Sequence, residues 1–480
     1  MPAQKEHSEQ KDLLQWIWAF PVLVPLLLVL FSYIFLSWSW GLMDDLQLLG
    51  VPGGVFERTK GIFLMYFHFG ECKWTHALHC ALFYKIFAHA PRLFHIFKWA
   101  EISAMLLVWG AAARRLTGRP VLVLLVPAIA LSFHYLYDQF FFLSTHETTG
   151  LLFLGLALWC VVKILFGKAN EKKSTYLWVA AGICLLLSLG AKETFVSGGI
   201  ALGLAVAALF WLSRPFQIRY LYSGLLLAAL YLAYGVVLKK VVCSVYTSGY
   251  SLFDLKVILG NFKTWVFKDL LNHTPWIAAA LALWFGTRKK SALYTVAEKW
   301  GIVLGVLLYA CFLAVLLPWN PTTYYAGPFG VFFAFTAAIF MAPLLETASP
   351  RRNFVIVAGA LVFNLFVAQY ALTRESTYHQ NTQDLWQWIK GNKDFQEADR
   401  LKQVDCNAPE AAMAIPGHAD RRWGLGLELF KYQGDVKQAL EEGARYFVYS
   451  PRFGTHAFDA SRWGTVFYSQ YWQVYQRQDR

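Results

Sequence analysis

Residues 176–212 have the sequence YLWVAAGICLLLSLGAKETFVSGGIALGLAVAALFWL, in which the only charged side chains are Lys192 and Glu193. These two charges divide the stretch into apolar runs at 176–191 and 194–212. A helix needs about 20 mostly apolar residues to cross the ~30 Å hydrocarbon core of a membrane. The stretch therefore predicts two membrane-spanning helices joined by a short turn, with a lysine and a glutamate at the membrane boundary.

Similar apolar runs recur along the first three-quarters of the 480-residue chain. The eleven expected spans are 14–38, 94–112, 120–137, 148–166, 176–191, 194–212, 220–238, 275–287, 300–317, 325–344 and 354–372. The first run is too long for a signal-peptide core and lacks a small-residue cleavage site, so we interpret it as a retained anchor. Only 15% of the residues are charged, against about 25% in soluble domains. This composition excludes an ordinary soluble enzyme, a disordered protein and a collagen-like fibre.

Basic residues predict the orientation of the spans, because short loops rich in Lys and Arg stay in the cytoplasm. With the N-terminus inside, about seventeen basic residues fall in inside segments, against only Lys192 in the three short outer loops. This asymmetry explains most of the net charge of +13 without nucleic acid as a partner. We expect a protein of the bacterial inner (cytoplasmic) membrane, with its N-terminus in the cytoplasm and its C-terminal domain outside.

Two domains are expected. Residues 1–374 form the transmembrane domain, with long outer loops at 39–93 and 239–274. In the second loop, apolar residues at helical spacing alternate with lysines, which is typical of an amphipathic helix at the membrane interface. Residues 375–480 mix helix-like stretches with short strand-like runs. The expected fold class is mainly α: a polytopic membrane bundle of about eleven helices with a small extracytoplasmic α/β C-terminal domain.

Polar residues gather at the predicted outer ends of the spans. They are Asp44 and Asp45 after the first span, Asp138 at the end of the third, His146 and Glu147 at the start of the fourth, Lys192 and Glu193, and Tyr324 and Tyr325 before the tenth. Ionisable groups at a membrane boundary are costly unless they line a water-filled cavity or pair with one another. Each could be a solvated turn, a helix cap or an interface ion pair, but their common depth favours one shared outer cavity.

Metal binding has little support in the sequence. The seven cysteines form no CxxC pair, so neither a zinc motif nor a disulfide framework is indicated. His76 and His79 stand three apart on an expected helix, but we identify no third ligand nearby, and we expect no metal site there. The carboxylates Asp44, Asp45 and Glu147 could hold Mg²⁺ or Mn²⁺. The chemistry inferred below does not require such an ion.

The residue types suit transfer of a sugar from a lipid phosphate. A carboxylate can deprotonate an acceptor hydroxyl that comes within hydrogen-bond reach. A lysine at the same depth can hold the carrier phosphate as a compact positive charge. Because a phosphate is already a good leaving group, no general acid is needed. The expected partners are the lipid bilayer, a polyprenyl-phosphate sugar donor and an acceptor glycan, lipid or protein.

The chain resembles the GT-C glycosyltransferases, which include protein O-mannosyltransferases and the lipid A aminoarabinose transferase. The similar features are the acidic pair Asp44-Asp45 after the first span, the stretch from Lys73 to His95, the Lys192-Glu193-Thr194 turn, and a proline-flanked tyrosine segment before a late span. The resemblance implies that Asp44 is the catalytic base, with Asp45 as its partner, and that Lys192 contacts the carrier phosphate. Where many relatives have Arg or Lys with Pro-Leu, this chain has Lys73-Trp74-Thr75-His76, and where they have a late Arg-Tyr it has Thr323-Tyr324-Tyr325.

Two other functions remain open at this point. A transporter or flippase for a lipid would commonly carry ionisable groups near the bilayer midplane and inverted repeats, and we identify neither. A non-catalytic scaffold would use its outer domain to bind a partner. The leading hypothesis is a membrane glycosyltransferase whose donor site includes Lys192, Glu193, Lys73, His76, Asp138, His146, Glu147, Tyr324 and Tyr325.

Overall fold

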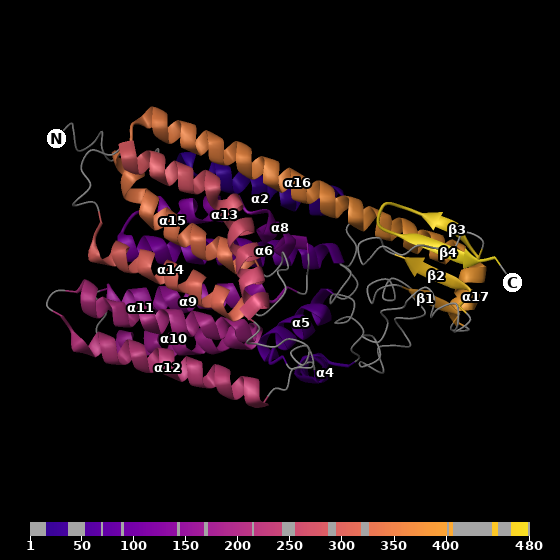
Figure 1. Ribbon diagram of the computed structural model, residues 1–480, viewed down its shortest axis with the longest axis horizontal. Helices are drawn as coiled ribbons and strands as arrows, with labels where there is room; N and C mark the ends of the chain where they lie inside the picture. Colours follow the sequence, from indigo (N-terminus) through magenta and orange to yellow (C-terminus); the bar gives the residue numbers. More distant parts are fainter. Residues whose placement is uncertain are drawn as a thin grey trace.

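The computed structural model describes most of the chain. The described residues are 16–36, 53–68, 71–87, 91–141, 145–167, 171–213, 216–241, 255–286, 294–317, 326–400, 403–406, 444–449 and 462–478. Helices dominate these residues, and one small sheet lies near the C-terminus (Figure 1). The expected helix-like stretches 424–432 and 436–443 and the expected strand 411–415 lie outside the described residues.

The helices form a bundle whose long axes run roughly along one direction (Figure 1). Their bounds are α2 Phe20–Phe35, α4 Val55–His68, α5 Trp74–Phe87, α6 Pro91–Thr117, α7 Leu122–Ala130, α8 His134–Phe141, α9 Glu147–Leu165, α10 Glu171–Ala191, α11 Val196–Leu212, α12 Ile218–Val241, α13 Leu255–Gly286, α14 Val296–Leu316, α15 Gly327–Thr347, α16 Pro350–Gly391 and α17 Lys393–Arg400. The short helices α4 and α5 lie at the end of the bundle that faces the sheet.

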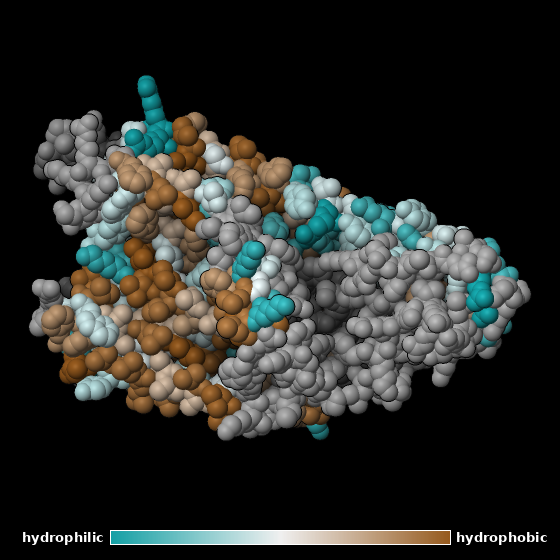
Figure 2. All heavy atoms as spheres, in the orientation of Figure 1, coloured by the Kyte–Doolittle hydropathy of each residue, from teal (hydrophilic) through white to brown (hydrophobic). Residues whose placement is uncertain are grey.

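Every apolar run that the sequence predicted to span a membrane overlaps one of these helices. Among the described residues, eight helices are long and apolar enough to cross a bilayer, and the pair α7–α8 would make a ninth. The helix α2 is apolar but shorter. Apolar side chains cover much of the bundle surface in Figure 2, whereas hydrophilic residues cover the far part of α16. The predicted polytopic helix bundle is therefore confirmed.

The third predicted span, 120–137, is not one helix. It divides into α7 and α8, which meet at an angle of 87°. Pro127 removes a backbone donor from α7, and the hydroxyl of Ser132 donates to the carbonyl of Ile129 at 2.5 Å, which satisfies an acceptor at the helix end. As a result Asp138 lies inside the short helix α8 rather than at the end of a span.

The second long outer loop is also different from the expectation. The amphipathic stretch and the predicted span 275–287 form one continuous helix, α13, with Pro275 in its interior. The residues between the two expected segments contain no glycine or proline that would end a helix before Pro275. The indole of Trp276 donates to the Ser132 hydroxyl at 2.6 Å, so α13 is attached directly to the break between α7 and α8.

Small residues let some helices approach closely. An added Cβ at Gly203 of α11 would lie 2.6 Å from the backbone nitrogen of Ala228 in α12, and one at Gly224 would lie 2.2 Å from that of Ala207. Neither glycine could carry a side chain without moving a backbone. Such small residues are typical of helix pairs packed in membranes, where close van der Waals contact replaces the hydrophobic effect.

One end of the bundle is closed by buried and partly buried charges. The guanidinium of Arg119, in the loop between α6 and α7, contacts Glu298 at 2.6 Å and also pairs with Glu346 at the end of α15. Glu298 completes a capping box with Thr295 at the start of α14. These contacts join three segments that the sequence places on the cytoplasmic side.

The last helix continues beyond the bundle. Helix α16 runs from Pro350 to Gly391 without interruption, through the expected domain boundary at residue 375, and reaches the sheet (Figure 1). The strands β1 Val404–Cys406, β2 Tyr446–Tyr449, β4 Gln473–Arg477 and β3 Trp463–Tyr468 lie in that spatial order, with β1 parallel to β2 and the other pairs antiparallel. The sheet packs on α16, and the Trp472 indole donates to the Thr382 hydroxyl at 3.2 Å.

Asn364 joins three helices in the membrane bundle. Its buried amide donates to the carbonyls of Pro21 in α2 and Ala128 in α7, each at 2.9 Å. The Pro21 carbonyl lacks its helical donor because Pro25 has no N–H, and Ala128 lies in the last turn of α7, where carbonyls also lose their helical donors. One side chain thus satisfies two acceptors that the backbone leaves open.

We predict that Asn364→Leu destabilises the bundle, because it leaves two buried carbonyls without donors at a cost of about 1–3 kcal/mol each. The measurement is the apparent melting temperature of the purified protein in detergent. Val362→Ala is the matched control, since Val362 lies on the same helix and is 67% exposed. Equal melting temperatures for Asn364→Leu and the wild-type protein would contradict this role of Asn364.

Candidate functional site

Three separate segments of the chain meet at the end of the bundle that carries α4 and α5. They are residues 71–76 before and at the start of α5, residues 145–147 at the start of α9, and residues 192–194 between α10 and α11. An added Cβ at Gly190 would lie 2.2 Å from the Trp74 ring and 2.3 Å from the Thr75 hydroxyl, so the start of α5 packs on the last turn of α10.

A buried ion pair holds the centre of this region. The Nζ atom of Lys192 lies 2.5 Å from Oε1 of Glu147, and Nε2 of His146 lies 3.2 Å from the same oxygen. Lys192 is the only non-helical residue between α10 and the 3₁₀ turn Glu193–Phe195, and it has an extended backbone. Its side chain is 4% exposed, so the Glu147 carboxylate, and not hydration by water, stabilises its positive charge.

A second lysine lies at the edge of the same region. The ammonium of Lys73 contacts Oε2 of Glu71 at 2.6 Å and lies 4.4 Å from the centre of the Tyr66 ring. Burial raises the pKa of the Glu71 carboxyl, but the hydrogen-bonded Lys73 ammonium, with smaller contributions from His146 and Lys192, outweighs this and holds the pKa below its ordinary value. Glu71 is therefore ionised at neutral pH, and Lys73, like Lys192, has its own carboxylate partner.

Two histidines connect the segments through their rings. The rings of His76 and His146 are 5.1 Å apart in an edge-to-face arrangement. Burial lowers the pKa of His76 well below its ordinary value, and it lowers the pKa of His146 to about 4 although Glu147 acts in the opposite direction. Both rings are therefore neutral at pH 7. The thiol of Cys80 lies 3.5 Å from Nε2 of His76, which supplies the third metal-binding side chain that the sequence interpretation had overlooked.

Several buried polar atoms of this region have no hydrogen-bond partner among the described residues. They are Oε2 of Glu147, Oε2 of Glu193, Nδ1 of His146, and the hydroxyls of Thr75 and Thr194. Buried polar groups are normally satisfied by protein or water, so a group of unpaired ones indicates that a polar ligand or water completes the site. The region thus offers acceptors and hydroxyls beside two lysines.

A further polar network lies beside α5. Glu101 of α6 contacts the ammonium of Lys98 at 3.1 Å, accepts from the Thr149 hydroxyl at 2.5 Å and lies 3.6 Å from Nε2 of His79. Lys98 also donates to the carbonyl of Thr145 at 2.7 Å, directly before the His146-Glu147 pair. This network was not predicted from the sequence, although a Lys and a Glu three residues apart in an apolar span are a usable signal.

Asp138 lies in a different set of contacts. It pairs with Arg374 of α16, whose Nε atom also contacts Glu375 at 2.6 Å. Its neighbour Gln139 accepts from the Thr148 hydroxyl at 3.2 Å, which links α8 to the start of α9. Arg374 was missed because its partner is 236 residues away in the chain, and no local pattern indicates such a pair.

The structure therefore places six of the expected site residues together: Lys73, His76, His146, Glu147, Lys192 and Glu193. Asp138 lies with Arg374. The acidic pair Asp44 and Asp45 and the tyrosines Tyr324 and Tyr325 lie outside the described residues. Glu71 joins the site as a residue that the sequence analysis did not include.

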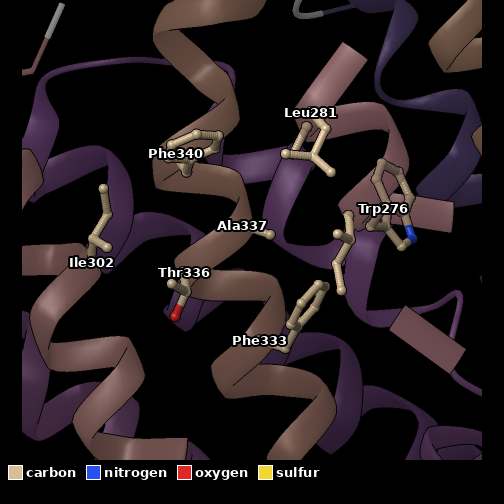
Figure 3. Close-up of a pocket in the computed structure, with 9 residues that line it drawn as sticks. Trp276, Leu281, Ile302, Phe333, Thr336, Ala337 and Phe340 are labelled. Carbon is tan, nitrogen blue, oxygen red and sulfur yellow. The ribbon is translucent and has the colours of Figure 1, made fainter. Parts of the chain in front are cut away.

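An apolar cavity of about 210 Å³ lies elsewhere, among α13, α14 and α15 (Figure 3). Its lining includes Trp276, Leu281, Phe333 and Phe340, and its one hydroxyl-bearing residue is Thr336. No ionisable side chain lines it. This cavity suits hydrocarbon and has no group that could act on a phosphate or a sugar.

No protein-family model matches the chain, and no curated protein sequence matches it. Among solved structures, ArnT from Cupriavidus metallidurans in the apo state has 13% sequence identity and a TM-score of 0.55, and ArnT bound to undecaprenyl phosphate has 12% and 0.53. Each match covers 96% of this chain and 97% of the ArnT chain. The Archaeoglobus fulgidus oligosaccharyltransferase tethered with an acceptor peptide is more distant, with 14% identity and a TM-score of 0.46 over 90% of this chain and 68% of that one.

The match to ArnT includes the helical bundle, the α4–α5 region and the sheet that follows the last long helix, since it covers nearly the whole of both chains. The resemblance proposed from the sequence is thus confirmed at the level of the fold: this chain has the fold of the GT-C glycosyltransferases.

Proposed function

We propose that this protein is a membrane glycosyltransferase. It transfers a sugar from a polyprenyl-phosphate donor to the hydroxyl of a glycan, lipid or protein acceptor on the outer side of the membrane. The GT-C fold supports a transferase in general, and the undecaprenyl phosphate bound in one ArnT structure makes a polyprenyl phosphate a reasonable donor carrier. The proposal includes the orientation that the basic loops predict, with the site facing outward.

The observation that carries the proposal is the buried polar site at the α4–α5 end of the bundle. It contains two lysines, each paired with a carboxylate, and several buried acceptors that find no partner within the described segments. Lysine ammonium groups can hold a phosphate. The unpaired acceptors suit the hydroxyl groups of a sugar, which donate hydrogen bonds. A site with both features fits a phosphate-linked sugar better than a bare lipid.

In the proposed reaction, the carboxylate of Asp44 takes the proton of the acceptor hydroxyl as its oxygen attacks the anomeric carbon. Asp45 assists Asp44. The bond from the anomeric carbon to the phosphate oxygen breaks, and the electron pair leaves with the carrier phosphate. A single displacement of this kind inverts the configuration at the anomeric carbon.

Lys192 and Lys73 hold the departing phosphate and stabilise its growing negative charge. Because the two ammonium groups supply the positive charge that balances the phosphate, the reaction requires no metal. Carboxylates could nevertheless hold Mg²⁺ or Mn²⁺. Glu147 and His146 position Lys192, and Glu71 positions Lys73. Tyr324, Tyr325 and Asp138 are assigned to contacts with the donor or with the segments around it.

We predict that Asp44→Asn abolishes transfer while the protein still folds and inserts in the membrane. An amide cannot accept the acceptor proton, and loss of a general base typically costs about 10²–10⁴-fold in rate. The product is identified first, by mass spectrometry of cell-surface glycans and glycolipids with and without the intact protein. Transfer is then measured in proteoliposomes, with folding checked by gel filtration in detergent. Undiminished activity of Asp44→Asn would refute the assignment of the base.

We also predict that Lys192→Gln weakens donor use. It removes the charge that faces the carrier phosphate and leaves the buried Glu147 carboxylate unpaired. We expect a loss of at least tenfold in kcat/KM for the donor, with a smaller loss in Lys192→Arg, which keeps the charge. The measurement is the rate of transfer at varied donor concentration.

The matched control is Arg119→Gln, which breaks an ion pair between a partly buried arginine and the buried Glu298 at the opposite end of the bundle. This variant is expected to lower the melting temperature but to keep the donor KM. If Lys192→Gln and Arg119→Gln changed the donor KM equally, Lys192 would have only a structural role and the proposed phosphate contact would be wrong.

A further inference from the structure

Helix α5 carries three metal-binding side chains on one face. They are His76, His79 and Cys80, one ligand atom of each lying within 4.8 Å of the others. Residues three and four apart on a helix lie on the same side, which brings His76 above both His79 and Cys80. His76 and Cys80 are buried, and the side chain of His79 is only 12% exposed.

The separation of the Cys80 and His76 atoms suits a tetrahedral metal, and a ligand atom of His79 lies within 4.8 Å of both. Zinc bonds to a thiolate at about 2.3 Å and to an imidazole at about 2.0–2.1 Å, which places sulfur and nitrogen about 3.5 Å apart around a tetrahedral ion. The observed distance from Sγ of Cys80 to Nε2 of His76 is 3.5 Å. One thiolate and two imidazoles are ligands that favour zinc over magnesium or calcium, which prefer oxygen.

Independent evidence comes from His79. Both of its ring nitrogens are buried and have no hydrogen-bond partner among the described residues. The Glu101 carboxylate lies 3.6 Å from its Nε2 atom. Metal-bound histidines commonly have such a carboxylate beside the ring, where it fixes the ring orientation. Burying an imidazole whose nitrogens make no hydrogen bond costs free energy. A metal ion bound to one of the ring nitrogens would remove this cost.

We propose that His76, His79 and Cys80 bind one zinc ion, with water in the fourth position. The ion holds the first turns of α5 in place beside Tyr66 of α4 and Glu101 of α6. Because Lys73 directly precedes α5 and the His76 ring contacts His146, the ion also fixes the geometry of the neighbouring polar site. Its role is structural, and the proposal does not depend on the proposed transferase activity.

The test is the metal content of the full-length protein purified in detergent without chelators, measured by mass spectrometry of its metals. We expect about one zinc per chain. Cys80→Ser and His79→Ala should each reduce the zinc content at least fivefold, whereas Cys311→Ser, a cysteine change in α14, should leave it unchanged. Full zinc content in both Cys80→Ser and His79→Ala would overturn the proposal.

A measurement on the wild-type protein covers the case in which these variants fail to fold. Protein whose zinc has been removed by chelation is titrated with Co²⁺, and we expect a thiolate-to-cobalt charge-transfer absorption that saturates at one ion per chain. Adding Zn²⁺ should remove this absorption. A wild-type protein that contains no zinc and develops no such absorption with Co²⁺ would show that His76 and Cys80 are only a packed pair.

Discussion

The ion pair between Glu147 and Lys192 is the constraint around which this end of the molecule is built. Transferring one charge from water to a buried position costs several kcal/mol, so neither side chain could be buried without the other. The 2.5 Å contact therefore requires the start of α9 and the end of α10 to remain side by side. His146, which precedes Glu147, and Glu193, which follows Lys192, are placed by the same contact. The polar site exists because this pair is satisfied inside an apolar bundle.

The two ends of the bundle differ in how their charges are satisfied. At one end Arg119 pairs with Glu298 and Glu346, and Glu298 also caps α14, so each group has partners within the protein. At the other end the lysines are paired, but Glu147 and Glu193 each keep a buried oxygen that accepts no hydrogen bond from the part of the chain that the structure describes. Each such oxygen costs about 1–3 kcal/mol unless a water or a ligand donates a hydrogen bond to it. Under the proposed function, the donor would supply such hydrogen bonds at this second end.

Sequence patterns predicted the parts of this structure that depend on local composition. The apolar runs located the helices because a membrane requires long apolar segments, and the charges of Lys192 and Glu193 marked the break between α10 and α11. The sharp break between α7 and α8 was not predicted, because Pro127 and Ser132 allow a bend without requiring one. Pairs such as Asp138–Arg374 could not be predicted, since their members lie on distant helices. His146 and Lys192 were identified as polar residues at one depth, and Lys73 through the family resemblance. Which carboxylate each lysine contacts could be seen only in the folded chain.

The length of α16 links the two parts of the molecule mechanically. A helix rises 1.5 Å and turns about 100° for each residue, so its 42 residues form a rod about 63 Å long from the bundle to the sheet. Arg374 attaches the middle of this rod to α8, and Thr382 attaches the sheet to its far part. The sheet therefore has a fixed rotational setting about the rod. Inserting one residue between these two attachment points would rotate the sheet by about 100° relative to α8, so the number of residues in this segment sets the orientation of the sheet relative to the bundle.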